Sequence, residues 1–299
     1  MHEQAVAFTT PSAAPRWKRW LLFSPLARIV IFAALFVGLM MLARFGFHLL
    51  GWGKGTPAPQ LAIAQFVVRA LVPLAAYLLL VKGVERRPLA ELAPRRLLPQ
   101  GLSGALFGLL LFSAVVATLW LLGSYRVTGS NPDAAWVNAL LVVGLGAGIG
   151  EEIIARGVIF RVVEEGLGSW WALLISALFF GAAHIANPGA TLWSSAAIAI
   201  EAGLLFGMLY HVTRSLAACM GLHAAWNFAQ GTIYGIPVSG SDADGWLISS
   251  RSGPDWLSGG AFGAEASVVA LVLCSLCTLG LLVVARRRGS IVPPAWRRR

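Results

Sequence analysis

One stretch of the sequence decides the fold: Val142-Val143-Gly144-Leu145-Gly146-Ala147-Gly148-Ile149-Gly150-Glu151-Glu152-Ile153-Ile154-Ala155-Arg156-Gly157-Val158-Ile159-Phe160. It is an apolar run that contains two adjacent carboxylates, Glu151 and Glu152. Each of them costs roughly 2.5–3.5 kcal/mol on insertion into hydrocarbon. Arg156 follows Glu152 by one helical turn and so lies on the same face of a helix. Charged groups kept inside such a helix usually form a functional site.

The composition around this stretch is that of a membrane protein. The chain has 299 residues, of which 58% are hydrophobic and 12% charged, and its mean hydropathy is +0.74. Long apolar runs without strict alternation indicate helices rather than barrel strands. We therefore predict an all-α, polytopic transmembrane helix bundle. About eight spans are expected, over 29–50, 61–82, 101–123, 135–162, 170–187, 192–211, 216–235 and 262–285.

The net charge of +10 indicates membrane orientation rather than nucleic-acid binding, because the basic residues flank the apolar runs. The predicted outer loops contain only Lys54, Arg126 and Arg251, whereas the N-terminal segment, the inner loops and the tail contain many Arg and Lys residues. This asymmetry predicts an even number of spans with both termini cytoplasmic. We expect one multi-pass domain, residues 1–299, in a bacterial inner membrane, with a catalytic core at 134–240.

Polar residues on three separate spans form the candidate site. The fourth span carries Glu151, Glu152 and Arg156, the fifth carries Phe180-x-x-x-His184, and the seventh carries His223-x-x-x-Asn227. At about 1.5 Å per residue, counted from the predicted inner turns, Glu151, His184 and Asn227 lie about 22, 24 and 20 Å deep, and His223 lies about 14 Å deep. Such agreement in depth favours one site over scattered structural polar groups.

The residue types favour activated water. A carboxylate in a dry site gains basicity and can take a proton from water, which a nearby His can share. A second His and an Asn amide can donate hydrogen bonds to the oxyanion that forms at a peptide carbonyl. Arg156 would hold a Glu ionised. The alternative is zinc held by Glu151, His184 and His223, although the H-E-x-x-H spacing is absent; we expect no cofactor.

These motifs resemble those of the CAAX prenyl endopeptidase type II and bacteriocin-processing (Abi, or CPBP) intramembrane peptidases. Glu151-Glu152-x-x-x-Arg156 resembles the family's E-E-x-x-x-R motif, and the His184 and His223-Asn227 motifs resemble its F-x-x-x-H and H-x-x-x-N motifs. The resemblance covers about 134–240. One departure is Ala155, where the family usually carries a bulky residue.

The resemblance implies a metal-independent glutamate peptidase. Glu151 and His184 would activate water, and His223 and Asn227 would form the oxyanion site. Glu152 and Arg156 would support the first carboxylate. The implied partners are the lipid bilayer and a membrane-embedded or lipid-anchored peptide substrate, with no nucleic acid.

Three further features have structural as well as functional interpretations. Glu201, in the sixth span, could support the site from behind by pairing with Arg44, Arg69 or a site His. Glu164 and Glu165 are interpreted as a solvated inner turn. The outer loop 236–261 could anchor at the interface through Trp246 and Trp256 or cover a substrate.

The leading hypothesis is an intramembrane endopeptidase that hydrolyses a peptide bond of a membrane-associated protein. Buried Glu, Arg and His would also suit a proton-coupled transporter, but the polar groups are confined to the second half of the chain, without the inverted repeat of such carriers. A third hypothesis is a non-catalytic immunity or scaffold protein.

Overall fold

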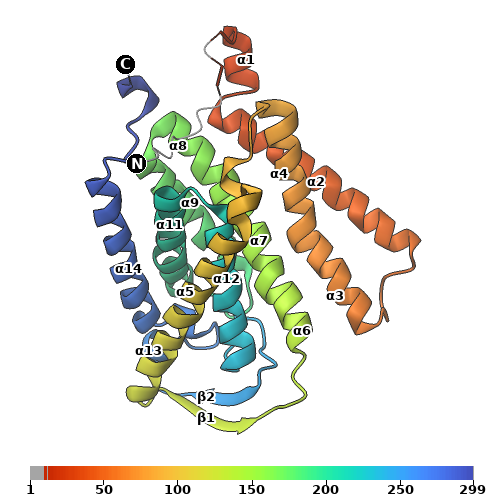
Figure 1. The fold of residues 1–299 in the computed structure, drawn as a ribbon. Helices are drawn as coiled ribbons and strands as arrows, with labels where there is room; N and C mark the ends of the chain where they lie inside the picture. Colours follow the sequence, from red (N-terminus) through yellow and green to blue (C-terminus); the bar gives the residue numbers. More distant parts are fainter. Residues whose placement is uncertain (1–9, 12, 299) are drawn as a thin grey trace.

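The fold is a bundle of long helices with one small sheet (Figure 1). The computed structural model describes residues 10–11 and 13–298, and the chain is 73% helical. Seven helices in this part are long and apolar enough to cross a membrane: Pro25–Leu49, Ala58–Glu85, Pro94–Leu121, Trp136–Leu167, Ser169–Ala186, Leu192–Thr213 and Val268–Arg287. The predicted helical bundle is confirmed, and the fourth predicted span is the longest at 32 residues.

Several of these helices contain π-helical or 3-10 turns, so one span joins several labelled elements. The α-helices are α1 (Arg16–Leu21), α2 (Pro25–Leu49), α3 (Ala58–Phe66), α4 (Val72–Leu79), α5 (Pro94–Leu121), α6 (Trp136–Asn138), α7 (Ala147–Glu152), α8 (Arg161–Leu167), α9 (Ser169–Ala183), α10 (Leu192–Ile198), α11 (Leu205–Thr213), α12 (Leu216–Phe228), α13 (Asp255–Ser258) and α14 (Val268–Arg287). The π-helical turns are η1 (Val67–Leu71), η2 (Leu80–Glu85), η4 (Ala139–Gly146), η5 (Ile153–Phe160), η7 (Ala199–Leu204) and η8 (Ala229–Ile233). The 3-10 turns are η3 (Ala90–Leu92), η6 (His184–Ala186), η9 (Ala264–Ala266) and η10 (Ala295–Arg297).

The predicted seventh span exists as α12 continued by η8, but it is not among the seven apolar helices. His223, Asn227 and Gln230 lower its hydropathy. All three side chains are buried, so neighbouring helices shield this helix from lipid. Its polarity therefore reflects a position inside the bundle.

Close backbone contact fixes α12 against α5. A Cβ added at Gly221 would lie 2.0 Å from the carbonyl oxygen of Gly101, and one added at Gly108 would lie 2.3 Å from that of Leu222. Only glycine allows two helices to approach this closely. Because the contact includes Leu222, the residue before His223, it also sets the position of the site histidine.

The helix that carries Glu151 is held between two neighbours. Gly148 faces α12, where an added Cβ would lie 3.0 Å from the Ala224 nitrogen. Gly150 faces η1, where an added Cβ would lie 1.9 Å from the Arg69 carbonyl oxygen. The glycine run thus allows close helix packing on both sides, immediately before the two carboxylates.

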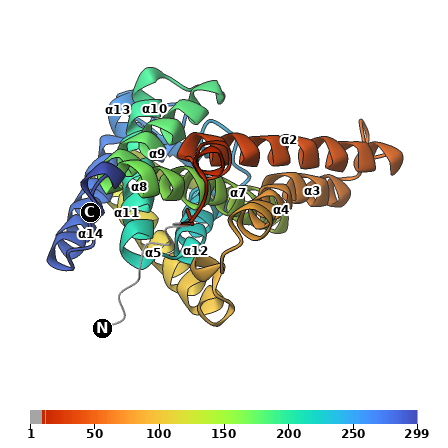
Figure 2. The same ribbon diagram turned by 90° about the horizontal axis from the view of Figure 1, so that it is seen from above.

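The two ends of the bundle differ. Strands β1 (Tyr125–Ser130) and β2 (Leu247–Arg251) pair antiparallel, with Tyr125 opposite Arg251 and an irregularity between Val127 and Gly129. We call their end the sheet end. Figure 1 shows α1, the α8–α9 turn and the C-terminal segment at the opposite end, which we call the basic end. Seen from above, α2 and α3 extend away from the other helices (Figure 2).

Buried ion pairs fill the basic end, and the predicted solvated turn at Glu164 and Glu165 is wrong. Glu165 pairs with Arg28 at 2.6 Å, and both side chains are buried. Glu164 is fully buried; it pairs with Arg214 and accepts a hydrogen bond from Ser169 Oγ at 2.8 Å. These partners come from other elements, and the local sequence does not reveal them.

Candidate active site

The two adjacent carboxylates of the site point in different directions. Successive residues of a helix project about a quarter-turn or more apart, so Glu152 faces the interior while Glu151 faces a cavity. The Glu152 side chain is 0% exposed, whereas that of Glu151 is 38% exposed. The pair therefore provides one buried charge and one accessible carboxylate.

Glu152 joins Arg156 to His223. Its Oε1 lies 2.8 Å from Arg156 Nη1 and 2.9 Å from His223 Nδ1. Since a carboxylate only accepts, both nitrogens donate. The ion pair expected from the four-residue spacing of Glu152 and Arg156 is thus present, and it holds the His223 ring rather than touching Glu151.

Arg156 is fully buried and secured on several sides. Its Nη2 donates to the carbonyl oxygens of Ala202 at 3.0 Å and Gly203 at 3.2 Å. Its guanidinium lies 4.7 Å from the ring centroid of Phe180 and 5.2 Å from that of Phe206. These contacts compensate the buried charge and link η5 to η7, α9 and α11.

His184 directly follows α9, the helix that carries Phe180. Its Nδ1 lies 2.7 Å from the Phe180 carbonyl oxygen and must donate to it. Its Nε2 lies 3.8 Å from Glu151 Oε2. In the neutral ring this leaves an unprotonated Nε2 facing the carboxylate.

Glu151, His184 and His223 converge on one point. His223 Nε2 lies 3.9 Å from the same Glu151 Oε2 that is 3.8 Å from His184 Nε2. That oxygen is buried and has no hydrogen-bond partner among the described residues. Polar atoms separated by more than 3.5 Å are often bridged by water. The geometry suits a water molecule bound between the carboxylate and the imidazoles.

Asn227 lies beside this group on the α12 face that His223 shares. Its Nδ2 donates to the Val143 carbonyl oxygen at 3.1 Å, which fixes the amide. An amide nitrogen carries two hydrogens, so one remains available. The structure thus brings together the six predicted residues Glu151, Glu152, Arg156, His184, His223 and Asn227.

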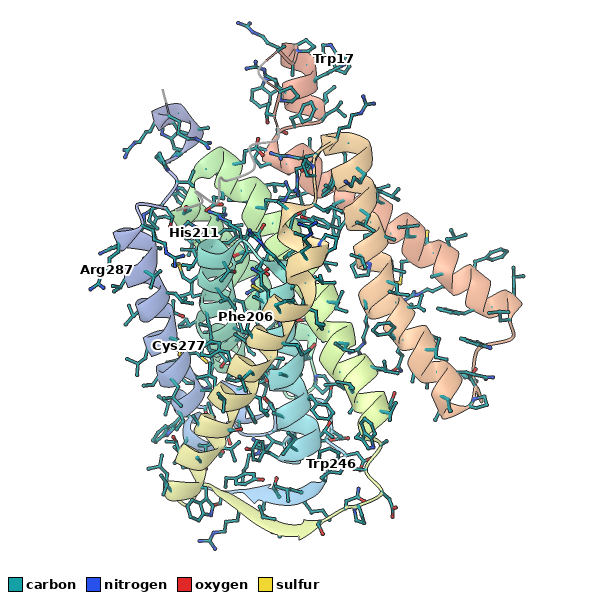
Figure 3. All side chains as sticks on the ribbon, in the orientation of Figure 1. Trp17, Phe206, His211, Trp246, Cys277 and Arg287 are labelled. Carbon is teal, nitrogen blue, oxygen red and sulfur yellow. The ribbon has the colours of Figure 1, made fainter. Side chains whose placement is uncertain are left out.

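Two cavities meet at His184. The His223 cavity, about 20 Å³, is lined by His184, His223, Asn227, Glu201, Ser239 and Glu265, among others. It has room for about one water molecule. The Glu151 cavity, about 200 Å³, is lined by Glu151, Ile154, Phe179, Phe180, Ala183, His184 and Asn187. Phe206, which also lines the His223 cavity, is labelled near the middle of the bundle in Figure 3.

Glu201 lies at the site, in the wall of the His223 cavity. It is buried, and its Oε2 lies 3.8 Å from Cys274 Sγ, which donates to it. Arg69, one of its predicted partners, packs instead beside Gly146 and Gly150. Glu201 is thus a second buried carboxylate close to the two histidines.

Glu265 is a site residue that the sequence analysis missed. It lies in η9, in the segment that leads into α14, and lines the same cavity as Glu201. Its Oε1 accepts the Ser239 N–H at 2.6 Å. Burial raises the pKa of Glu265 above its ordinary 4.5, although the hydrogen bond from Ser239 and the charge of His184 lower it in part. The signal was available, since Glu265 is the only charged residue of the predicted span 262–285.

The zinc alternative needs three or more donor side chains placed around one point. Within residues 10–11 and 13–298, no group of three or more His, Cys, Asp or Glu side chains is arranged to hold one. The three groups of the zinc alternative, Glu151, His184 and His223, meet at 3.8–3.9 Å.

The fold and the site define a multi-pass integral membrane protein with a buried Glu–His constellation. Residues 133–229 match the family model described as Rce1-like, type II CAAX prenyl endopeptidase. The match includes all three motifs, so the family resemblance predicted from them is confirmed over this segment, and the family is one of CAAX-type membrane proteases. No curated protein matches the chain.

Proposed function

We propose that the chain is an intramembrane endopeptidase that hydrolyses a peptide bond with water activated by Glu151 and His184. The supporting observation is the convergence of one accessible carboxylate and two imidazoles, from three helices, within 3.9 Å. The family match supports the same reaction class. A scaffold does not need this convergence, and a proton-coupled transporter would be expected to carry an inverted repeat.

In the proposed reaction, Glu151 takes a proton from the water as the water oxygen attacks the substrate carbonyl carbon. His184, which accepts through Nε2, orients that water. The protonated Glu151 then gives the proton to the leaving amine nitrogen as the C–N bond breaks. The products are a carboxylic acid and an amine, and Glu151 returns to its ionised form. General base catalysis of this kind contributes roughly 10²–10⁴-fold.

The negative charge on the former carbonyl oxygen needs donors. Asn227 supplies its free amide hydrogen. His223 supplies Nε2–H when its ring is protonated, a form that the Glu152 carboxylate at 2.9 Å balances. Glu152 and Arg156 act as positioning residues for His223, and Glu201 lies behind the same cavity as a further supporting group.

The substrate class follows from the family name and the cavity walls. The family description names prenyl endopeptidases, and Ile154, Phe179 and Phe180 give the Glu151 cavity apolar walls. We propose a membrane-embedded or lipid-anchored peptide as substrate, and a bacterial inner membrane as the location.

The experiment compares new protein N-termini in membranes of cells that express wild type, Glu151→Gln, His184→Gln or Asp133→Asn. Asp133 is exposed near the sheet end and serves as the matched carboxylate control. We expect one set of new N-termini in cells that express wild type or Asp133→Asn. This set should be absent from cells that express either site variant at the same protein level. Identical termini in all four would refute hydrolysis by this site.

A chelator arm decides the role of metal. Cleavage by purified wild type should persist in the presence of a zinc chelator. If the chelator abolished cleavage and zinc restored it, a zinc-bound water would replace the carboxylate-activated water.

A further inference from the structure

The span Leu192–Thr213 contains a π-helical turn, η7, and Glu201 lies in it. Turns of this kind are frequent at functional sites. The carbonyl oxygens of Ala202 and Gly203, the two residues after Glu201, accept the hydrogen bonds of Arg156 Nη2. The backbone of η7 thus secures the site arginine, while the Glu201 side chain lines the His223 cavity.

Glu201 has no cationic partner among the residues that the structure describes. It is 2% exposed, and the one hydrogen bond that its carboxyl group accepts there comes from the Cys274 thiol at 3.8 Å. A thiol is a weak donor. Five other buried glutamates each pair with an arginine, namely Glu85, Glu91, Glu152, Glu164 and Glu165. An isolated carboxylate is costly in a dry interior, and such a group keeps its proton instead.

The neighbouring Glu265 points to the same protonation state. Both carboxyl groups line a cavity of about 20 Å³, and two like charges so close together disfavour each other. Glu265 accepts the Ser239 N–H at 2.6 Å, a bond that stabilises an ionised carboxylate. Glu201 accepts no backbone N–H from the described residues. Of the two, Glu201 is therefore the one that favours the protonated form.

The His223 cavity is also the place where the proposed oxyanion donors meet. His223 and Asn227 line it together with Glu201, and its volume suits about one water molecule, or one oxygen atom of a substrate. An ionised carboxylate in this wall would repel an oxyanion. A protonated carboxyl group instead presents an O–H donor. Carboxylic acids kept neutral by apolar surroundings serve as oxyanion donors in other enzymes.

We propose that Glu201 is protonated in the resting protein and donates its carboxyl O–H into the His223 cavity, as a third hydrogen-bond donor to the substrate oxyanion beside Asn227 and His223. This inference rests on the proposed endopeptidase function and completes its oxyanion site. The proton stays on Glu201 throughout the reaction, because Glu201 stabilises charge and transfers none. Glu151 remains the group that takes the proton from water.

The first test detects the proton on Glu201 without a substrate. Infrared spectra of the purified full chain at neutral pH are recorded for wild type, Glu201→Gln and Asp133→Asn. The C=O stretching band of protonated carboxyl groups should lose intensity in Glu201→Gln and remain unchanged in Asp133→Asn. An unchanged band in Glu201→Gln would overturn the inference, whatever the activity of the protein.

The second test asks whether the donor matters for cleavage. Gln at position 201 has nearly the shape of a protonated Glu and keeps an N–H donor, whereas Met fills a similar volume without one. Removing one oxyanion donor costs roughly 10²–10³ in kcat, so Glu201→Met should lose about that much with little change in KM. Glu201→Gln should stay within about tenfold of wild type.

Three outcomes of the second test are decisive, with thermal unfolding confirming that each variant is folded. A loss in Glu201→Gln as large as that in Glu201→Met would show that the ionised form is needed, and would overturn the inference. Full activity of Glu201→Met would also overturn it, while the endopeptidase function stood. Wild-type protein that cleaves nothing would refute the endopeptidase function and the donor role together, and the infrared band would still decide the protonation state.

Discussion

The Nδ1–H of His223 is donated to the carboxylate of Glu152 at 2.9 Å, on the side of the ring away from Glu151. This hydrogen bond orients Nε2 toward Glu151. Arg156 binds the same Glu152 oxygen, so the ring is held by a charged pair that never contacts the reacting groups. The two neighbouring glutamates thus have different roles: Glu152 orients the His223 ring, and Glu151 faces the cavity.

Glu152→Gln should slow cleavage while the protein remains folded. Gln can still accept the His223 Nδ1–H, but a hydrogen bond to a charged group contributes about 1.5–3 kcal/mol and one between neutral groups about 0.5–1.5 kcal/mol. Replacing the charged acceptor by a neutral one therefore lowers kcat roughly tenfold. KM should change little, because Glu152 is buried away from the substrate. Steady-state kinetics with a substrate found by terminal mapping measure both. An unchanged kcat would contradict the role of Glu152 in holding His223.

Gly150→Ala should lower both stability and activity. The added Cβ would lie 1.9 Å from the Arg69 carbonyl oxygen, so α7 must move, at a cost of roughly 1–3 kcal/mol, and Glu151 moves with it. Gly38→Ala in α2 is the matched control, since nothing lies within 4 Å of its added Cβ. Thermal unfolding in detergent and cleavage rates should fall for Gly150→Ala alone; equal behaviour of both variants would contradict the packing argument.

Much of the site was predictable because polar residues in apolar helices have few structural explanations. The ion pair of Glu152 with Arg156 follows from their spacing on one helix. The convergence of Glu151, His184 and His223 was expected from the motifs, and the structure provides the distances.

The remaining features depend on tertiary contacts that the local sequence does not contain. Glu265 reaches the site because the segment after β2 folds back into the bundle. The predicted span 262–285 placed Glu265 inside a membrane helix, whereas α14 begins at Val268. Glu165 resembled a surface residue, yet Arg28 of α2 covers it.

Glu265→Gln should make thermal stability less dependent on pH. Burial raises the pKa of Glu265 above 4.5. At a pH between 4.5 and this raised pKa, the Glu265 carboxyl is protonated in the folded protein and loses its proton on unfolding. Stability is therefore lost as the pH rises from about 4.5 through the raised pKa. Gln remains neutral and can still accept the Ser239 N–H. The difference in Tm between Glu265→Gln and wild type should increase with pH in detergent; a constant difference would contradict the raised pKa.

Arg87→Met should destabilise the basic end more than any exposed arginine does. Arg87 binds Glu91 through two hydrogen bonds of 2.8 and 2.9 Å and Glu85 through a third of 2.9 Å. Burial alone would raise the pKa of Glu91, but Arg87 lowers it below 4.5, so this pair stabilises the fold above that pH and less as the pH falls through the lowered pKa. Removing one partner of a buried pair costs about 3–5 kcal/mol.

The neighbouring Arg86→Met is the control, because Arg86 is exposed. Thermal unfolding at pH 7 should show a large loss for Arg87→Met only, and equal losses for the two variants would contradict the stabilising role of these ion pairs.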